Sequence, residues 1–229
     1  HCPEIVAIDK KSIQACQNRV MNLSEPLEGL MSPVEAAVLR VLSRTDAGFS
    51  GRQVHALAGE GSTTTVHRAL RNLSRVGLAA VEVRPPALIY RPNREHVLWS
   101  AVESALRARE RAIDGIRQFF VDNVPEEVPS DGHVTATLYG SVARRTSTAD
   151  SDVDVLVVFP DDFDPDARAD FVLRLAERIE ELTGNDAQVN SLLRGEFLLR
   201  QRDDDPFLSN VAGEGIHLFG PTPDMWRAA

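Results

Sequence analysis

The chain has 229 residues and a net charge of −9, and its content of 43% hydrophobic and 26% charged residues is typical of folded globular proteins. No apolar run approaches the roughly 18 residues of a membrane span and no secretory signal pattern appears near the start, so we expect a cytoplasmic protein without membrane association. The two cysteines, Cys2 and Cys16, argue against a disulfide framework and against a CxxC metal site.

The length predicts one or two domains. Residues 1–31 show little periodicity and are interpreted as an arm or tag. Residues 32–95 contain three short helical patterns, each preceded by a serine suited to cap a helix, and then a predicted hairpin. The capping serines are Ser32, Ser50 and Ser62, and the hairpin turns at Pro85-Pro86.

Three short helices followed by a hairpin resemble a winged helix-turn-helix domain of the ArsR or MarR type. The resemblance implies that the third helix enters the major groove of double-stranded DNA and that the protein reads two half-sites as a homodimer. Residues 32–95 carry nine arginines and five acids, a net charge of +4, which leaves −13 for the remainder and suits an anionic partner. The alternative is a small helical packing module without a DNA role. The expected DNA contacts are Ser62, Thr63, Thr64, Thr65, His67, Arg68, Arg71, Arg84 and Arg91.

Residues 96–124 are predicted to form one long amphipathic linker helix. Apolar residues recur mostly at intervals of three or four from Val97 to Phe120. This stripe fits either a link between two domains or the seam of a dimer. Prolines, glutamates and a glycine in residues 124–132 then indicate a domain boundary.

Residues 125–221 alternate strand-like and helical patterns, and residues 222–229 are left as a tail. The predicted order is strand, turn, strand, helix, strand, two short helices and a last strand. The predicted fold class is therefore α+β in two domains: an N-terminal winged helix-turn-helix, a long linker helix and a C-terminal mixed α/β sheet.

Two carboxylates, Asp152 and Asp154, stand in the apolar run that forms the second of these strands. Residues two apart in a strand point to one face, about 6.6–6.8 Å apart, so both carboxylates lie on the same side. Their repulsion and desolvation are costly unless a divalent cation binds, and Mg²⁺ takes carboxylate oxygens together with substrate phosphates. Upstream, Gly140 allows the backbone to approach a phosphate and Ser141 adds a hydroxyl.

The residues around these aspartates carry a more specific resemblance. The segment GSVARRTSTADSDVDVLVV, residues 140–158, resembles the signature of the DNA polymerase β-like nucleotidyltransferase superfamily, and more narrowly the small bacterial minimal nucleotidyltransferases, which include antitoxins. The usual pattern is GS-x-A-R-G-x(5)-S-D-x-D, and this chain departs from it where Arg145 replaces the glycine. The resemblance implies transfer of a nucleoside monophosphate from an NTP to a hydroxyl acceptor, which in antitoxin relatives is on a protein, with Mg²⁺ or Mn²⁺ as cofactor. It assigns the metal to Asp152 and Asp154, and the nucleotide to Gly140, Ser141, Arg144 and Ser151. Two residues that depart from the pattern, Arg145, whose positive charge suits a polyphosphate, and Gln188, are also expected to contact the nucleotide.

In this superfamily a third carboxylate from a later strand usually completes the site and acts as the base for the attacking hydroxyl. Alignment by pattern places that position on Gln188, within the predicted strand AQVNSLL. An amide cannot act as a base and is a poor Mg²⁺ ligand. Asp186, two residues earlier, is the candidate to replace it as a catalytic residue beside Asp152 and Asp154, unless it belongs to the turn after Gly184.

Three hypotheses follow. The first is an enzyme, a nucleotidyltransferase with a DNA-binding domain attached. The second is a transcriptional regulator whose transferase-like domain binds NTP without turnover, which Gln188 favours. The third is an antitoxin that pairs with a partner toxin protein, for which the long helix supplies a docking surface.

Overall fold

A computed structural model describes residues 21–124 and 133–222, which divide into two compact units. The first unit is Glu25–Glu110, and the second combines the residues up to Ser24 with those from Arg111 onward. Most of the expected arm, of the boundary after residue 124 and of the tail lies outside the described residues.

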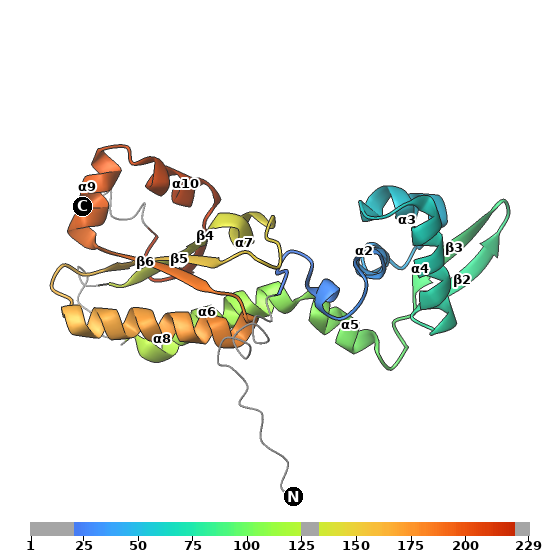
Figure 1. The fold of residues 1–229 in the computed structure, drawn as a ribbon, viewed down its shortest axis with the longest axis horizontal. Helices are drawn as coiled ribbons and strands as arrows, with labels where there is room; N and C mark the ends of the chain where they lie inside the picture. The colour runs from blue at the N-terminus through green and yellow to red at the C-terminus, as the bar shows by residue number, and fades with distance from the viewer. Residues whose placement is uncertain (1–20, 125–132, 223–229) are drawn as a thin grey trace, which may run out of the picture. The chain divides into compact units, whose positions relative to one another are not determined.

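The unit Glu25–Glu110 contains a helical cluster and a small antiparallel sheet (Figure 1). Its elements are η1 (Pro26–Gly29), α2 (Pro33–Leu42), β1 (Phe49–Ser50), α3 (Gly51–Ala58), α4 (Thr63–Arg75), β2 (Ala79–Arg84), β3 (Ala87–Pro92) and α5 (Trp99–Leu106). The strand order is β1-β3-β2, and β2 and β3 form the predicted hairpin. The hydroxyls of Ser32, Ser50 and Ser62 each accept a hydrogen bond from the backbone N–H three residues later, so these serines cap α2, α3 and α4 as expected.

The short strand β1 was not predicted. It pairs Phe49 with Tyr90 and Ser50 with Ile89 of β3. A two-residue strand has no periodicity of its own, so only its pairing with a distant strand defines it.

The single helix expected over residues 96–124 is divided in the structure. Helix α5 ends at Leu106, α6 runs over Ala108–Asn123, and Arg107 between them has a non-helical backbone. Residues on the two sides of the break pack into different cores: Trp99 belongs to that of the first unit and Ile116 to that of the second. One continuous apolar stripe is therefore replaced by two separate ones.

The second unit is a four-stranded sheet with helices on both faces (Figure 1). After α6 its elements are β4 (Thr135–Tyr139), α7 (Gly140–Arg144), β5 (Val153–Phe159), α8 (Pro165–Thr183), β6 (Ala187–Leu193), α9 (Arg194–Arg202), α10 (Pro206–Glu214) and β7 (Ile216–Phe219). The strand order is β6-β5-β4-β7, with β5 and β6 parallel and the other pairs antiparallel. The predicted mixed α/β sheet is thus present. Helices α6 and α8 cover one face, and α7, α9 and α10 lie on the other.

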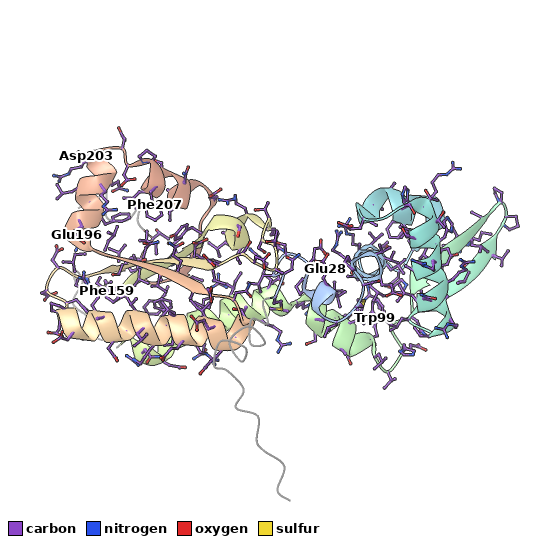
Figure 2. The ribbon with its side chains drawn as sticks, in the orientation of Figure 1. Glu28, Trp99, Phe159, Glu196, Asp203 and Phe207 are labelled. Atoms are coloured by element: carbon purple, nitrogen blue, oxygen red, sulfur yellow. The ribbon has the colours of Figure 1, made fainter. Side chains whose placement is uncertain are left out.

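Successive side chains of β5 point to opposite faces of the sheet, and this alternation decides which face carries Asp154. Val155, Val157 and Phe159 are buried in the core that includes α6 and α8. Figure 2 labels Phe159, which lies between the sheet and α8. Leu156 packs on the opposite side, in the cluster formed with α9 and α10. Asp154 therefore lies on the face that carries α7, α9 and α10.

Residues 21–31, the last part of the expected arm, contribute to both cores. Leu23 is 2% exposed in the core of the second unit, and Leu27 is 2% exposed in that of the first. Within the described residues, no helix is both long and apolar enough to cross a bilayer.

Candidate functional site

The candidate site lies where β4 ends and α7 begins, beside the first residues of β5. Gly140 has a φ of +73°, and a Cβ atom at this position would overlap Oδ2 of Asp154. Tyr139, the residue before Gly140, is the antiparallel partner of Asp154. Glycine alone combines this backbone conformation with room for the carboxylate, so the position of Asp154 requires the glycine of the motif.

The carboxyl group of Asp154 has a raised pKa. Burial is the largest cause, repulsion from the Asp152 carboxylate adds to it, and the positive charge of Arg144 opposes it. Asp152 is exposed and immediately precedes β5. Two neighbouring carboxylates repel each other, and a divalent cation between them would remove that repulsion.

Gln188 and Asp186 lie on the strand next to β5. Gln188 is the direct partner of Asp154 in the parallel register, which is the position where the sequence pattern places the third carboxylate. Asp186 is exposed just before β6, and its backbone C=O accepts a hydrogen bond of 2.9 Å from the N–H of Val153. Asp186 is thus beside the start of β5, two residues from Gln188 along the chain.

The donor set of the site fits a cation that binds together with a phosphate. Across residues 21–124 and 133–222, no three histidine, cysteine or acidic side chains are grouped so that they could hold a metal ion. The set present is two carboxylates, Asp152 and Asp154, with the amide of Gln188 in the next strand. Mg²⁺ commonly takes one or two carboxylates and completes its coordination with water and phosphate oxygens.

The loop between α7 and β5 has a defined conformation. Arg145 has φ +60° and ψ +37°, a left-handed conformation that glycine adopts at lower cost, and glycine is the usual residue of the pattern here. The hydroxyl of Ser151 accepts a hydrogen bond of 2.9 Å from the N–H of Thr148, which closes a turn inside the loop. Arg144 forms an ion pair with Glu214 of α10. Ser151 and Arg144, both expected to contact nucleotide, therefore also hold the frame of the site.

Ser141 lies in the first turn of α7. Its side chain is half-buried, and its backbone C=O accepts a hydrogen bond of 2.9 Å from the N–H of Thr146. This bond closes the C-terminal end of α7 onto its start, so the short helix and the loop after it form one folded turn.

Two residues that the sequence analysis does not single out hold this loop. Asn185 is 1% exposed, and its side-chain amide donates to the backbone C=O groups of Ser151 at 3.0 Å and Ala149 at 3.2 Å. The hydroxyl of Ser24 accepts a hydrogen bond of 2.9 Å from the N–H of Ser147. The only signal for Asn185 in the sequence is a polar residue after the glycine that ends a helix, which does not differ from an ordinary turn.

A polar pair continues the site along the sheet. The side-chain amide of Asn190 donates a hydrogen bond of 2.5 Å to the Tyr139 hydroxyl. Burial raises the pKa of Tyr139, the hydrogen bond from Asn190 opposes that rise, and the charge of Asp154 adds to it. Asn190 is two residues beyond Gln188 and shares its face, so polar side chains surround Asp154 on both neighbouring strands.

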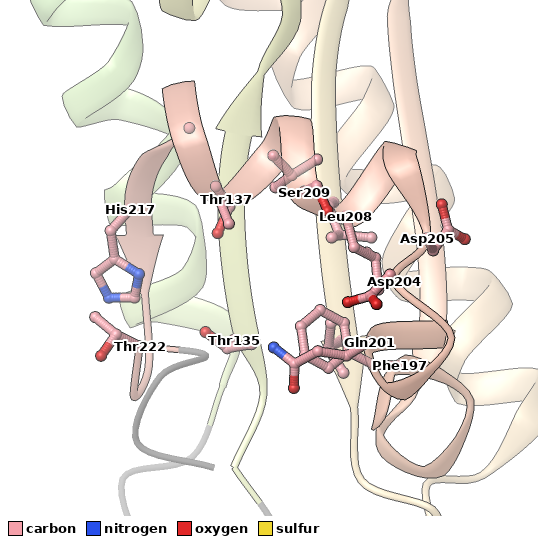
Figure 3. Close-up of a pocket in the computed structure, with 15 residues that line it drawn as sticks. Thr135, Thr137, Phe197, Gln201, Asp204, Asp205, Leu208, Ser209, His217 and Thr222 are labelled. Atoms are coloured by element: carbon pink, nitrogen blue, oxygen red, sulfur yellow. The ribbon is translucent and has the colours of Figure 1, made fainter. Parts of the chain in front are cut away.

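A cavity of about 220 Å³ opens farther along the same face, between the strands and helices α9 and α10 (Figure 3). Leu156 and Val158 contribute apolar surface, and Gln201, Asp204 and His217 contribute polar groups. Figure 3 shows His217 across the cavity from Gln201 and Asp204. Its lining contains no lysine or arginine among the described residues, so the cavity is a poor match for a triphosphate.

Helix α4 exposes most of the side chains expected to contact DNA. Its core face holds Val66, Ala69, Leu70 and Leu73, while the following are exposed: Thr63, Thr64, His67, Arg68 and Arg71. Ser62 is also exposed and Thr65 is half-buried, and the two bond to each other. The N–H of Thr65 donates to the Ser62 hydroxyl at 3.2 Å, and the Thr65 hydroxyl donates to the Ser62 C=O at 2.8 Å. These two residues therefore fix the start of α4.

The two arginines expected on the hairpin share one acid. Arg84 and Arg91 both pair with Glu82, at 2.5 Å and 2.9 Å. The hydrogen bond from Arg84 is the largest cause of the lowered pKa of Glu82. The hairpin thus presents two guanidinium groups that are only partly neutralised.

Known proteins resemble this chain over different shares of its length. A search of curated proteins gives no significant match. Among solved structures, a toxin–antitoxin protein crystallised with AMP-PNP is 23% identical over 49% of this chain and 76% of that one, with a TM-score of 0.33. A putative nucleotidyltransferase from Sulfolobus solfataricus is 17% identical over 50% of this chain and 85% of that one, with a TM-score of 0.27. An archaeal chromatin protein described as having a novel mode of DNA binding is 15% identical over 83% of this chain and 76% of that one, with a TM-score of 0.29.

The sequence match to a family model lies within the second unit and begins inside α6. It covers β4, α7, β5, α8 and β6, the elements that position Gly140, Asp154 and Gln188. Residues 115–203 match the family described as the nucleotidyltransferase domain, so this part of the chain is similar to that family.

Proposed function

We propose that the second unit binds a nucleoside triphosphate with Mg²⁺ or Mn²⁺ and transfers its nucleoside monophosphate to a hydroxyl acceptor. The observation that carries the proposal is the packing of Gly140 against Asp154, with the Asp152 carboxylate close enough to raise the pKa of Asp154. A fold that places a half-buried carboxylate next to a second, exposed one, at a glycine turn that permits close backbone approach, is suited to a metal-bound phosphate.

In this proposal Asp152 and Asp154 hold the cation, which would neutralise the phosphates and polarise the α-phosphate. Ser141 and the guanidinium groups of Arg144 and Arg145 contact the phosphate oxygens. The acceptor oxygen attacks the α-phosphorus, pyrophosphate leaves, and the hydroxyl proton passes to a base.

Asp186 is the proposed base, because the direct partner of Asp154 is Gln188 and an amide does not take up a proton. Asp186→Asn is expected to retain nucleotide binding and to lose label transfer from an α-labelled NTP. If the wild type binds nucleotide but transfers no label to protein, RNA or small-molecule hydroxyls, the alternative applies, in which the domain is a nucleotide sensor without turnover.

Calorimetric titration of each NTP with Mg²⁺ tests the binding step. The wild type is compared with the Asp152→Asn/Asp154→Asn pair and with Asp150→Asn, a matched control that changes an exposed acid of the same loop. Saturable binding in the wild type and in the control, lost in the pair, is the expected result. Equal binding in all three proteins would contradict the assigned site.

A second proposed function is binding of double-stranded DNA by residues 25–110, as a homodimer. It is favoured by the exposed side chains of Thr63, Thr64, Arg68 and Arg71 along one helix, beside a hairpin that carries Arg84 and Arg91. Band-shift titration with DNA from the surroundings of the coding sequence tests it. Affinity that does not depend on salt would contradict a role of these arginines in phosphate contact.

A further inference from the structure

Ser24 is hydrogen-bonded to the loop that precedes Asp152. Its hydroxyl lies 2.7 Å from that of Ser147 and accepts a bond of 2.9 Å from the Ser147 N–H. Ser147 is only 6% exposed, so water cannot readily replace the partner of that N–H. Leu23, which is 2% exposed in the core, anchors the backbone beside Ser24.

Asn185 makes a second connection between the same two segments. Its side-chain oxygen accepts from the Met21 N–H at 3.1 Å, and its amide donates to the Met21 C=O at 3.1 Å. The same amide group reaches the C=O groups of Ala149 and Ser151. One buried side chain therefore joins residue 21 to both sides of Asp150, immediately before the first carboxylate of the motif.

We propose that Ser24 and Asn185 are positioning residues for the nucleotide site. They fix the backbone of residues 146–151, and this backbone sets where the Asp152 carboxylate lies relative to Asp154. Ser24 and Asn185 bond three backbone groups of this six-residue loop, on Ser147, Ala149 and Ser151, which leaves Asp152 little freedom. A pair of ligands held in place binds a cation better than a pair that must be ordered on binding. The inference rests on the proposed binding of Mg–nucleotide by Asp152 and Asp154.

Residues 21–24 thereby contribute to the proposed nucleotide site. These residues directly precede Glu25, where the other unit begins. A segment read from sequence as an arm or tag becomes part of the nucleotide site, although it is more than 100 residues away from the motif along the chain.

The test measures affinity for Mg–ATP by calorimetry in the full chain, with melting temperature measured alongside. Ser24→Ala removes the partner of the Ser147 N–H, and affinity is expected to fall by about tenfold, the lower end of the effect of residues that orient metal ligands. Ser24→Thr keeps a hydroxyl and is expected to bind nearly as well as the wild type. Ser74→Ala is the matched control, because Ser74 is a partly buried serine whose hydroxyl donates to a backbone C=O in the other unit.

Three results would overturn the inference. Unchanged affinity in Ser24→Ala, with binding still lost in Asp152→Asn/Asp154→Asn, would overturn it and leave the proposed function intact. If affinity falls together with melting temperature in every variant, Ser74→Ala included, the loss of affinity reflects a general destabilisation of the protein. Absence of binding in the wild type would overturn both the inference and the proposed function.

A separate measurement does not depend on the variants. Hydrogen exchange at the Ser147 amide is expected to slow on addition of Mg–ATP, and an unchanged rate would contradict the inference.

Discussion

At the scale of single residues, Asp154 combines a proposed role in cation binding with a cost in stability. Burial and the Asp152 charge both disfavour its ionised form. Asp154→Asn is therefore expected to raise the melting temperature of the metal-free protein near neutral pH by a few degrees, since about 1 kcal/mol shifts the midpoint of a chain of this size by roughly 2–4 °C. Scanning calorimetry with a chelator present measures it, and a lower melting temperature would contradict the assigned environment.

The raised pKa of Asp154 also means that the stability of the fold and its affinity for Mg–nucleotide should depend on pH. Because the pKa of Asp154 is raised in the folded state, its contribution to stability is fully present below the unfolded pKa and is lost as pH rises through the folded one. The difference in melting temperature between Asp154→Asn and the metal-free wild type should therefore be largest near neutral pH and shrink on acidification. Mg–nucleotide affinity should fall over the same acid range, because protonation removes a ligand. A difference that stays constant with pH would contradict this prediction.

Arg145 is a further residue-scale case, because its φ of +60° is unusual for a residue with a side chain. Arg145→Gly is expected to stabilise the fold by up to about 1 kcal/mol, since relief of the left-handed strain exceeds the extra freedom of glycine in the unfolded chain. If Arg145 also contacts phosphate as proposed, nucleotide affinity falls in the same variant. Chemical denaturation and calorimetry measure the two effects separately.

At the scale of elements, the turn from β4 into α7 and the start of β5 form one unit through Gly140 and Asp154. Gly140→Ala places a Cβ atom on the Asp154 carboxylate at a positive φ, and we expect a loss of about 2 kcal/mol or more in stability. The double variant Gly140→Ala/Asp154→Ala removes the clash but keeps the backbone strain. It should therefore be less destabilised than the sum of its two single changes, a coupling that a double-mutant cycle measures. Strict additivity would show that the two residues do not meet.

Helix α4 gives a prediction at the same scale. Its exposed arginines are expected to contact phosphates, so Arg68→Ala and Arg71→Ala should each weaken DNA binding and reduce the slope of log affinity against log salt by about 1. Arg178→Ala, an exposed arginine of α8 in the other unit, is the control. A slope that changes equally in all three variants would contradict a role for α4.

At the scale of the whole molecule, much of the organisation was predictable because it is local. The three serine caps, the hairpin and the alternation along β5 each depend on a few neighbouring residues, and the structure has them as predicted. The resemblance to the superfamily places the position of the third carboxylate on Gln188, and the structure pairs that residue with Asp154 in the parallel register.

The sequence by itself determined most of the helices and strands, the acidic motif and its glycine turn. Only the tertiary structure decided that β1 joins the hairpin, that the long helix breaks at Arg107, and that Ser24 and Asn185 hold the loop before Asp152. These features come from pairs of residues far apart in the chain, Ser24 and Ser147 being 123 positions apart. No periodicity or spacing within the sequence records such a contact, because its stability depends on burial that exists only once the surrounding core has formed.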